Sequence, residues 1–158
     1  GMAIDAEANA YTNATYYDDG GILRTAIIAI NPMDCSSSVL VELNAASIGG
    51  YFSGVTLAVN GDGQDVVIAA AAGSLYIHNL VTHSTSTYLL GSDGADNVMA
   101  SPVIDSSGRV ILISNNHVVT ILDNMGFSYG HHFWPRFRKD NFGSSTVEKE
   151  IPETMVHE

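Results

Sequence analysis

One order of elements occurs twice along this chain: an apolar stretch, a polar turn that ends in glycine, and two more apolar stretches. The two turns are Asn-Gly-Asp-Gly at 60–63 and Asp-Ser-Ser-Gly at 105–108, and the glycines that end them lie 45 residues apart. Turns of this composition reverse the chain between antiparallel strands. A third, more diverged copy is expected at the front, with a turn at 16–20 and strands at 22–30 and 39–44. A repeat of this length predicts similar β-units stacked one after another.

The stretches that follow each turn have the pattern of strands. Residues 66–70 are continuously apolar, as expected for a strand that is covered on both faces. Residues 74–79 alternate, so that Leu75 and Ile77 lie on one face and Tyr76 and His78 on the other. The sequence therefore predicts an all-β fold of antiparallel, β-propeller-like blades near residues 10–50, 51–95 and 96–143. A single β-sandwich is the alternative.

The length of 158 residues fits one domain. We expect this domain to span residues 1–144, followed by a flexible tail at 145–158, where apolar residues are few. A closed propeller needs at least about four blades, whereas this chain holds three copies of the unit. The ring is therefore incomplete, and we expect it to close by self-association as a homodimer. A partial gene product is the alternative.

The chain is strongly acidic, with 17 Asp and Glu residues against 6 Lys and Arg residues and a net charge of −11. Such a surface repels phosphate backbones, so nucleic acid is not an expected partner. No apolar run approaches the roughly 20 residues of a membrane-spanning helix, and we expect no membrane insertion. The single cysteine, Cys35, excludes an intramolecular disulfide. The first residues lack the pattern of a signal peptide, and the compartment stays open.

The second clear copy reads Ser-Pro-Val-Ile-Asp-Ser-Ser-Gly-Arg-Val-Ile-Leu-Ile-Ser at 101–114 and Val-Thr-Ile-Leu-Asp at 119–123. This pattern resembles the repeat of quinoprotein-like (PQQ-like) β-propeller proteins. Residues 73–79 match the second half of that repeat, and residues 134–144 are similar to a segment that flanks such propellers. The resemblance implies propeller blades, in a family whose members are commonly exported and are often scaffolds rather than enzymes. The adjacent-cysteine disulfide and blade-closing tryptophans of the quinoprotein dehydrogenases are absent, so quinone binding is not expected.

The turn at 60–65 is also similar to the calcium loop of FG-GAP propeller repeats, in which spaced carboxylates and a glycine surround the ion. Its candidate ligands are Asn60, Asp62 and Asp65. Ala58 occupies the place of the first aspartate of that loop, so a plain hairpin turn is the favoured interpretation and a calcium site is the alternative. Calcium is the one cofactor that the sequence suggests.

Large aromatic and basic side chains gather between residues 131 and 140. In an extended segment Trp134 and Arg136 share one face, and two more basic residues follow. We interpret this segment first as a structural anchor across the last blade. The alternative is partner binding, because tryptophan and arginine dominate many interfaces. The partner-binding candidates are then Trp134, Arg136, Arg138 and Lys139.

Neither a serine–histidine–aspartate or cysteine–histidine arrangement nor a phosphate-binding glycine loop stands out in the sequence. The sequence therefore predicts a non-enzymatic scaffold or binding module for a protein or glycan partner. The alternatives are a fragment of a larger quinoprotein-like enzyme and a calcium-dependent adhesion protein.

Overall fold

The computed structural model describes residues 1–43, 53–71, 73–90, 98, 100–114 and 117–130. All regular elements in these residues are strands, and they form three antiparallel sheets. The prediction of an all-β fold is thereby confirmed. Within the same residues, no helix reaches the length and apolarity that crossing a membrane requires.

Each sheet is one stretch of chain, and its strands are hydrogen-bonded in sequence order. The first sheet contains β1 (Met2–Ile4), β2 (Ala10–Tyr17), β3 (Leu23–Ile30) and β4 (Ser37–Leu43). The second contains β5 (Thr56–Val59), β6 (Asp65–Ala71), β7 (Ser74–Asn79) and β8 (Thr85–Leu89). The third contains β9 (Val103–Ile104), β10 (Val110–Ile113) and β11 (Val119–Leu122).

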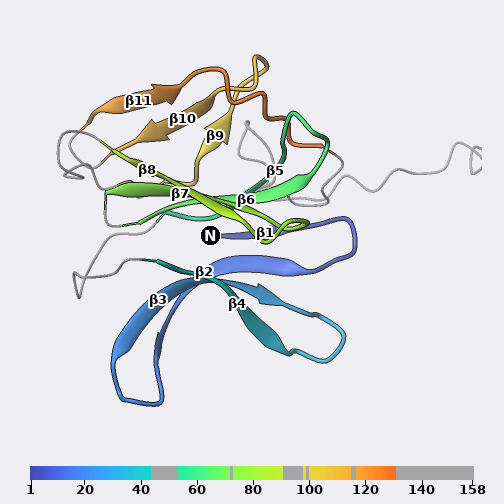
Figure 1. Cartoon of the computed structure of the whole chain (residues 1–158), viewed down its shortest axis with the longest axis vertical. Coiled ribbons are helices and arrows are strands. Elements are labelled where there is room, and N and C mark those ends of the chain that lie inside the picture. The colour runs from blue at the N-terminus through green and yellow to red at the C-terminus, as the bar shows by residue number, and fades with distance from the viewer. Residues whose placement is uncertain (44–52, 72, 91–97, 99, 115–116, 131–158) are drawn as a thin grey trace, which may run out of the picture.

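The three sheets are stacked in chain order, with the second between the other two (Figure 1). The inner strands β6 and β7 of the second sheet are buried on both faces, whereas β8 is exposed along its length. The side chains of β6 alternate between two clusters of apolar side chains. Val66, Ile68 and Ala70 face the third sheet, whereas Val67 and Ala69 face the first. This arrangement confirms that residues 66–70 form a strand covered on both sides.

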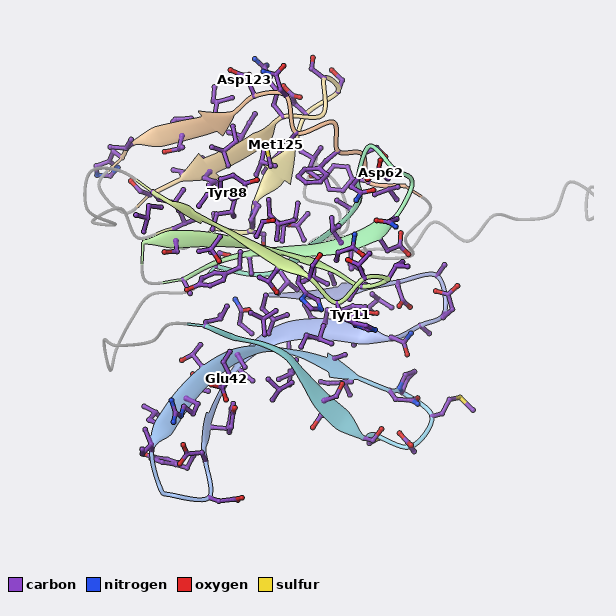
Figure 2. The ribbon with its side chains drawn as sticks, viewed as in Figure 1. Tyr11, Glu42, Asp62, Tyr88, Asp123 and Met125 are labelled. Carbon is purple, nitrogen blue, oxygen red and sulfur yellow. The ribbon has the colours of Figure 1, made fainter. Side chains whose placement is uncertain are left out.

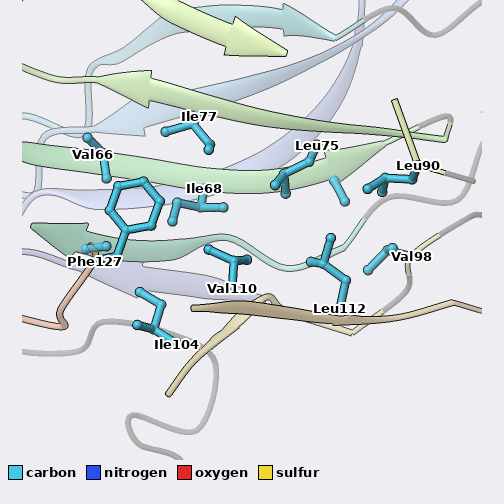
Figure 3. Close-up of a cluster of buried hydrophobic side chains, with 12 residues drawn as sticks. Val66, Ile68, Leu75, Ile77, Leu90, Val98, Ile104, Val110, Leu112 and Phe127 are labelled. Atoms are coloured by element: carbon cyan, nitrogen blue, oxygen red, sulfur yellow. The ribbon is translucent and has the colours of Figure 1, made fainter. Parts of the chain in front are cut away.

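The cluster between the second and third sheets is a continuous apolar core (Figure 3). Ile68 of β6 and Leu75 of β7 belong to the same cluster as Val110 and Leu112 of β10, and all four side chains are at most 1% exposed. Phe127, from the segment after β11, completes the cluster. Burial of each side chain of this kind contributes roughly 1.5–3 kcal/mol to the free energy of folding, relative to leaving it exposed. This core therefore holds the two sheets together.

The first turn of each sheet is built in the same way. A side-chain oxygen of Asp5, Asn60 or Asp105 accepts a hydrogen bond from the backbone N–H four residues later, at 2.8, 2.9 and 3.0 Å respectively. The residue three positions after it has a positive φ, of 70°, 76° and 75° in the three sheets. In the second and third sheets this residue is the glycine of the repeat, whereas in the first sheet it is Ala8.

The turn near the predicted 16–20 is built in the same way, because Oδ1 of Asp18 accepts the N–H of Ile22 at 2.8 Å and Gly21 has a φ of 73°. By strand order, however, the first turn of this sheet lies one strand earlier than the sequence predicts. The turn at Asp5 is the counterpart of those at Asn60 and Asp105, so β2 and β3 correspond to β6 and β7. The start escapes the sequence pattern because Ala8 adopts the left-handed conformation that usually favours glycine. The predicted stretches 22–30 and 39–44 coincide instead with β3 and β4. The predicted tail at 145–158 lies outside the described residues.

Candidate functional site

A groove of about 360 Å³ lies between strands β6, β7 and β8 of the second sheet and the segment that follows β11. Its polar lining consists of Asn60, Asn79, Ser84, Ser86, Tyr88 and Asn124. Its apolar lining consists of Val66, Ile77, Met125 and Phe127. Figure 2 shows Tyr88 and Met125 in the layer between the second and third sheets.

The floor and the rim of the groove differ in chemistry. Ile77 and Phe127 are less than 10% exposed and form part of the apolar core, whereas Tyr88 at the rim is 40% exposed. None of the described residues that line the groove is charged, although the chain as a whole carries a net charge of −11. The groove thus combines an apolar floor with uncharged hydrogen-bonding groups.

Three linked amide side chains support one end of the groove. Nδ2 of Asn79 donates to Oε1 of Gln64 at 2.7 Å, and Nδ2 of Asn60 donates to the same oxygen at 3.4 Å. Oδ1 of Asn79 accepts the backbone N–H groups of Val81 and Thr82, both at 2.9 Å. The amides are therefore held in fixed orientations by the two turns at this end of the second sheet. We call Asn60, Gln64 and Asn79 the amide triad.

The third sheet has charged side chains in a comparable arrangement. Asp105 and Arg109 occupy the first and fifth positions of the shared turn, and Asp123 follows β11. The Arg109 guanidinium lies 2.6 Å from Asp105 and 3.9 Å from Asp123. Hydrogen bonds from the backbone and then the side chain of Arg109 hold the pKa of Asp105 below its ordinary value. The amide triad is thus an uncharged counterpart of this ionic group.

Several polar groups of the groove are available to a ligand. Within the described part of the chain, the side chains of Ser86, Tyr88 and Asn124 have no hydrogen-bond partner. Asn124 has a φ of 57°, a left-handed conformation that asparagine adopts more readily than most residues. A hydroxyl group both donates and accepts, and an amide offers two N–H donors and a carbonyl oxygen. The groove can therefore both donate hydrogen bonds to a ligand and accept hydrogen bonds from it.

The predicted calcium ligands lie at the turn between β5 and β6. Asn60 and Asp62 belong to this turn, and Asp65 begins β6. Oδ1 of Asn60 accepts the backbone N–H groups of Asp62 and Gln64 at 3.0 and 2.9 Å, so a cation at this oxygen would compete with the hydrogen bonds of the turn. Among the described residues, no three His, Cys, Asp or Glu side chains form a group that could hold a metal ion. Calcium binding here stays a prediction.

A buried polar cluster lies between the first and second sheets. The Tyr11 hydroxyl donates to Oδ2 of Asp5 at 2.8 Å, and both residues are at most 6% exposed. Figure 2 shows Tyr11 on the side of the first sheet that faces the second. Burial, and then the bond to the Asp5 carboxylate, raise the pKa of Tyr11. Asp5 also accepts two hydrogen bonds from Asn9, so this cluster has the partners expected of a structural role.

Comparisons with known proteins find likeness in structure but not in sequence. No protein-family model matches the chain, and no curated protein matches it. A solved structure of the extracellular domain of a putative one-component system from B. thetaiotaomicron is similar at 14% identity and a TM-score of 0.45. That likeness covers 79% of this chain and 20% of the solved chain, so this chain spans about a fifth of the length of that protein.

The groove was not predicted from the sequence. Ser86, Tyr88 and Asn124 come from an outer strand and a loop that carry no distinctive motif. One difference between the two copies of the repeat could have indicated the groove. Asn60 and Gln64 occupy the turn positions that hold the charged residues Asp105 and Arg109 in the other copy. The residues predicted to bind a partner lie outside the described residues. They are Trp134, Arg136, Arg138 and Lys139.

Proposed function

We propose that this chain is a non-enzymatic scaffold or binding module whose three sheets act as β-propeller-like blades and whose outer faces associate with a second copy. One observation carries the proposal. The inner strands β6 and β7 of the central sheet are buried on both faces, whereas each outer sheet leaves one face of mixed or apolar side chains uncovered. Short antiparallel sheets that stack face to face in chain order support the comparison with propeller blades.

The uncovered face of the third sheet consists mainly of β-branched side chains. Side chains alternate along a strand, so the neighbours of the core positions on β10 and β11 point away from the second sheet. Ile113 pairs with Val119 and Ile111 pairs with Ile121 across these strands. Ile113, Val119 and Ile121 are 53%, 57% and 46% exposed. Exposed apolar patches of this kind mark interaction surfaces.

The uncovered face of the first sheet combines apolar and polar side chains. Ile28 pairs with Val39 on one side and with Thr12 on the other, and Val39 is 48% exposed. The same face includes Met2, which is 44% exposed and pairs with Thr12. The same face also carries Tyr16, Arg24 and Glu42, and the Tyr16 hydroxyl donates to Glu42 at 3.2 Å. The uncovered face of the first sheet is therefore mixed, whereas that of the third sheet is mainly apolar.

A second copy of the chain is the occupant that these faces favour. Two interfaces of this kind, in which one apolar sheet face packs on another, already hold the sheets of one chain together. A pair of chains can bury both kinds of uncovered face in a closed assembly, and closed two-fold dimers are the commonest homo-oligomers. In the alternative, a fragment of a larger quinoprotein-like enzyme, further blades of the same polypeptide would cover these faces.

The mass of the particle in solution tests this proposal. We expect light scattering behind size exclusion to give about twice the chain mass of 16.7 kDa across a concentration series. A double substitution, Ile113→Lys with Ile121→Lys, places two charges on the uncovered face and should return the chain to a monomer with unchanged circular dichroism. The matched control is Val81→Lys. Val81 lies in a turn and is 61% exposed, so this substitution should leave the dimer intact.

Two results would overturn the homodimer. One is a monomer at every concentration. The other is open-ended aggregation, which would support the alternative of a fragment with unsatisfied blade faces.

A further inference from the structure

We infer that the groove between the second and third sheets binds an uncharged, hydroxyl-rich ligand, of which a neutral saccharide unit is the chemical type. The inference rests on the proposal that the chain is a binding module, but not on its self-association, because a single chain provides the whole groove. The ten described residues that line it come from β6, β7, β8, the turns at Asn60 and Ser84, and the segment after β11.

The absence of charge in the lining is the first argument. A charged ligand in this groove would lose hydration without gaining a partner of opposite charge, and such a loss is costly. The neighbouring sheet shows that the repeat can place an ionic group at this kind of turn, since Arg109 contacts Asp105 there. At the groove, Asn60 and Gln64 occupy those two turn positions with amides. The lining therefore favours a neutral ligand.

The arrangement of apolar and polar groups is the second argument. A sugar ring carries C–H groups on its faces and hydroxyl groups around its edge. The floor offers Ile77 and Phe127 to the C–H face, and the rim offers the partly exposed ring of Tyr88. Within the described residues, the hydroxyl of Ser86 and the amide of Asn124 have no hydrogen-bond partner, so they can bind the hydroxyl groups at the edge of the sugar ring. Groups that donate and accept at once suit hydroxyl-rich ligands.

The volume of the groove is the third argument. About 360 Å³ lies at the lower end of the roughly 300–1,000 Å³ typical of small-molecule sites. Such a space suits a small ligand or the terminal unit of a longer chain, and its open rim lets a chain continue into solvent. The amide triad fixes one end because Gln64 accepts hydrogen bonds from both flanking asparagines.

Binding to a defined saccharide panel tests the inference. The probes are neutral oligosaccharides of glucose, xylose, mannose and galactose, together with uronic-acid and sugar-phosphate counterparts, observed by saturation-transfer NMR and titration calorimetry. We expect at least one neutral member to bind with a Kd of about 1 mM or tighter, and its charged counterpart to bind at least about tenfold more weakly.

Three variants place this binding in the groove. Tyr88→Ala and Asn124→Gly should each weaken binding by about tenfold, and the glycine keeps the positive φ available at that position. The combined substitution Asn60→Asp, Gln64→Arg and Asn79→Asp copies the residue types of the ionic group of the third sheet and should abolish binding. The matched control is Leu89→Ala, which alters the next residue of β8, 74% exposed and on the other face of the strand, and should bind normally.

Each contrary result overturns the inference in a recognisable way. It is wrong if no neutral saccharide binds, if the charged counterparts bind better, or if binding persists in Tyr88→Ala and Asn124→Gly, which would place the ligand elsewhere. The particle mass, measured on the same samples, decides the homodimer independently. If no saccharide binds in the groove but the particle has the mass of a dimer, the proposal of a scaffold stands without a saccharide ligand.

Discussion

His78 is a buried ionisable side chain of the second sheet, at 3% exposure. Its Nδ1 lies 2.9 Å from the Thr85 hydroxyl, and its Nε2 has no hydrogen-bond partner among the described residues. Burial, and then repulsion from nearby His83, lower its pKa from the ordinary value of 6.5. The folded state therefore favours the neutral imidazole, whereas the unfolded chain takes up a proton near pH 6.5.

A pH dependence of stability follows from this difference. A histidine whose pKa is lowered by folding gives its full stability above the unfolded value of 6.5 and loses it as the pH falls below that value. We expect the melting temperature to fall when the pH is lowered from about 7.5 to about 5, a range in which histidine is the side chain that ordinarily titrates.

Replacement of the ring tests the cause. His78→Asn should flatten the pH dependence, whereas His117→Asn, at an exposed position with a φ of 61°, should leave it unchanged. Equal slopes for the two variants in calorimetry would show that another group is responsible.

The turns that begin the second and third sheets look alike in sequence but differ in their surroundings. Gly63 has a φ of 76°, and a Cβ added there would meet no atom within 4 Å. Gly108 has a φ of 75°, and the same Cβ would lie 2.8 Å from the backbone oxygen of Phe127 and 2.9 Å from its nitrogen. The chain after β11 therefore passes directly over the second of these turns.

Alanine at the two glycines should separate backbone strain from steric contact. Gly63→Ala should cost about 1–2 kcal/mol, the strain of a left-handed alanine. Gly108→Ala should cost about 1–3 kcal/mol more, because Phe127 must move and its side chain belongs to the core. Urea unfolding of both variants measures the difference. Equal losses would mean that the segment at Phe127 shifts freely.

These turns also show which parts of the fold can be predicted from the sequence and which cannot. The glycines, the apolar run of β6 and the alternation of β7 are local signals, and they predict strands and turns correctly. The first turn of the first sheet escapes because Ala8 replaces glycine, and the hydrogen bond between Asp5 and Asn9 is visible only in three dimensions. The groove escapes for the same reason, since Tyr88 and Asn124 meet only when the second and third sheets stack.

At the scale of the whole molecule, the three sheets differ in how much of their surface is covered. Strand β6 is flanked by β5 and β7 within its sheet and by apolar clusters on both faces. Strand β11 is the last strand of its sheet, and its Val119 and Ile121 are exposed. Opening β6 to solvent therefore requires disruption of the whole stack, whereas β11 can open locally.

Amide hydrogen exchange should show this gradient. We expect the slowest exchange at the amides of β6 and β7, and faster exchange at β11 in dilute samples. If the outer faces associate as proposed, protection of β11 should rise with protein concentration while that of β6 stays constant. Exchange at β11 that is as slow as at β6 in a dilute monomer would contradict the gradient.

Every pair of hydrogen-bonded strands within the three sheets joins neighbours in sequence. The loops that must close during folding are therefore short, and chains with such local contacts fold faster than β-proteins whose strands pair over long distances. On the ribosome, the first sheet has all of its strands by Leu43, well before the strands that cover it are made. Folding of this chain can thus advance layer by layer with synthesis, and each new sheet finds a surface already formed to receive it.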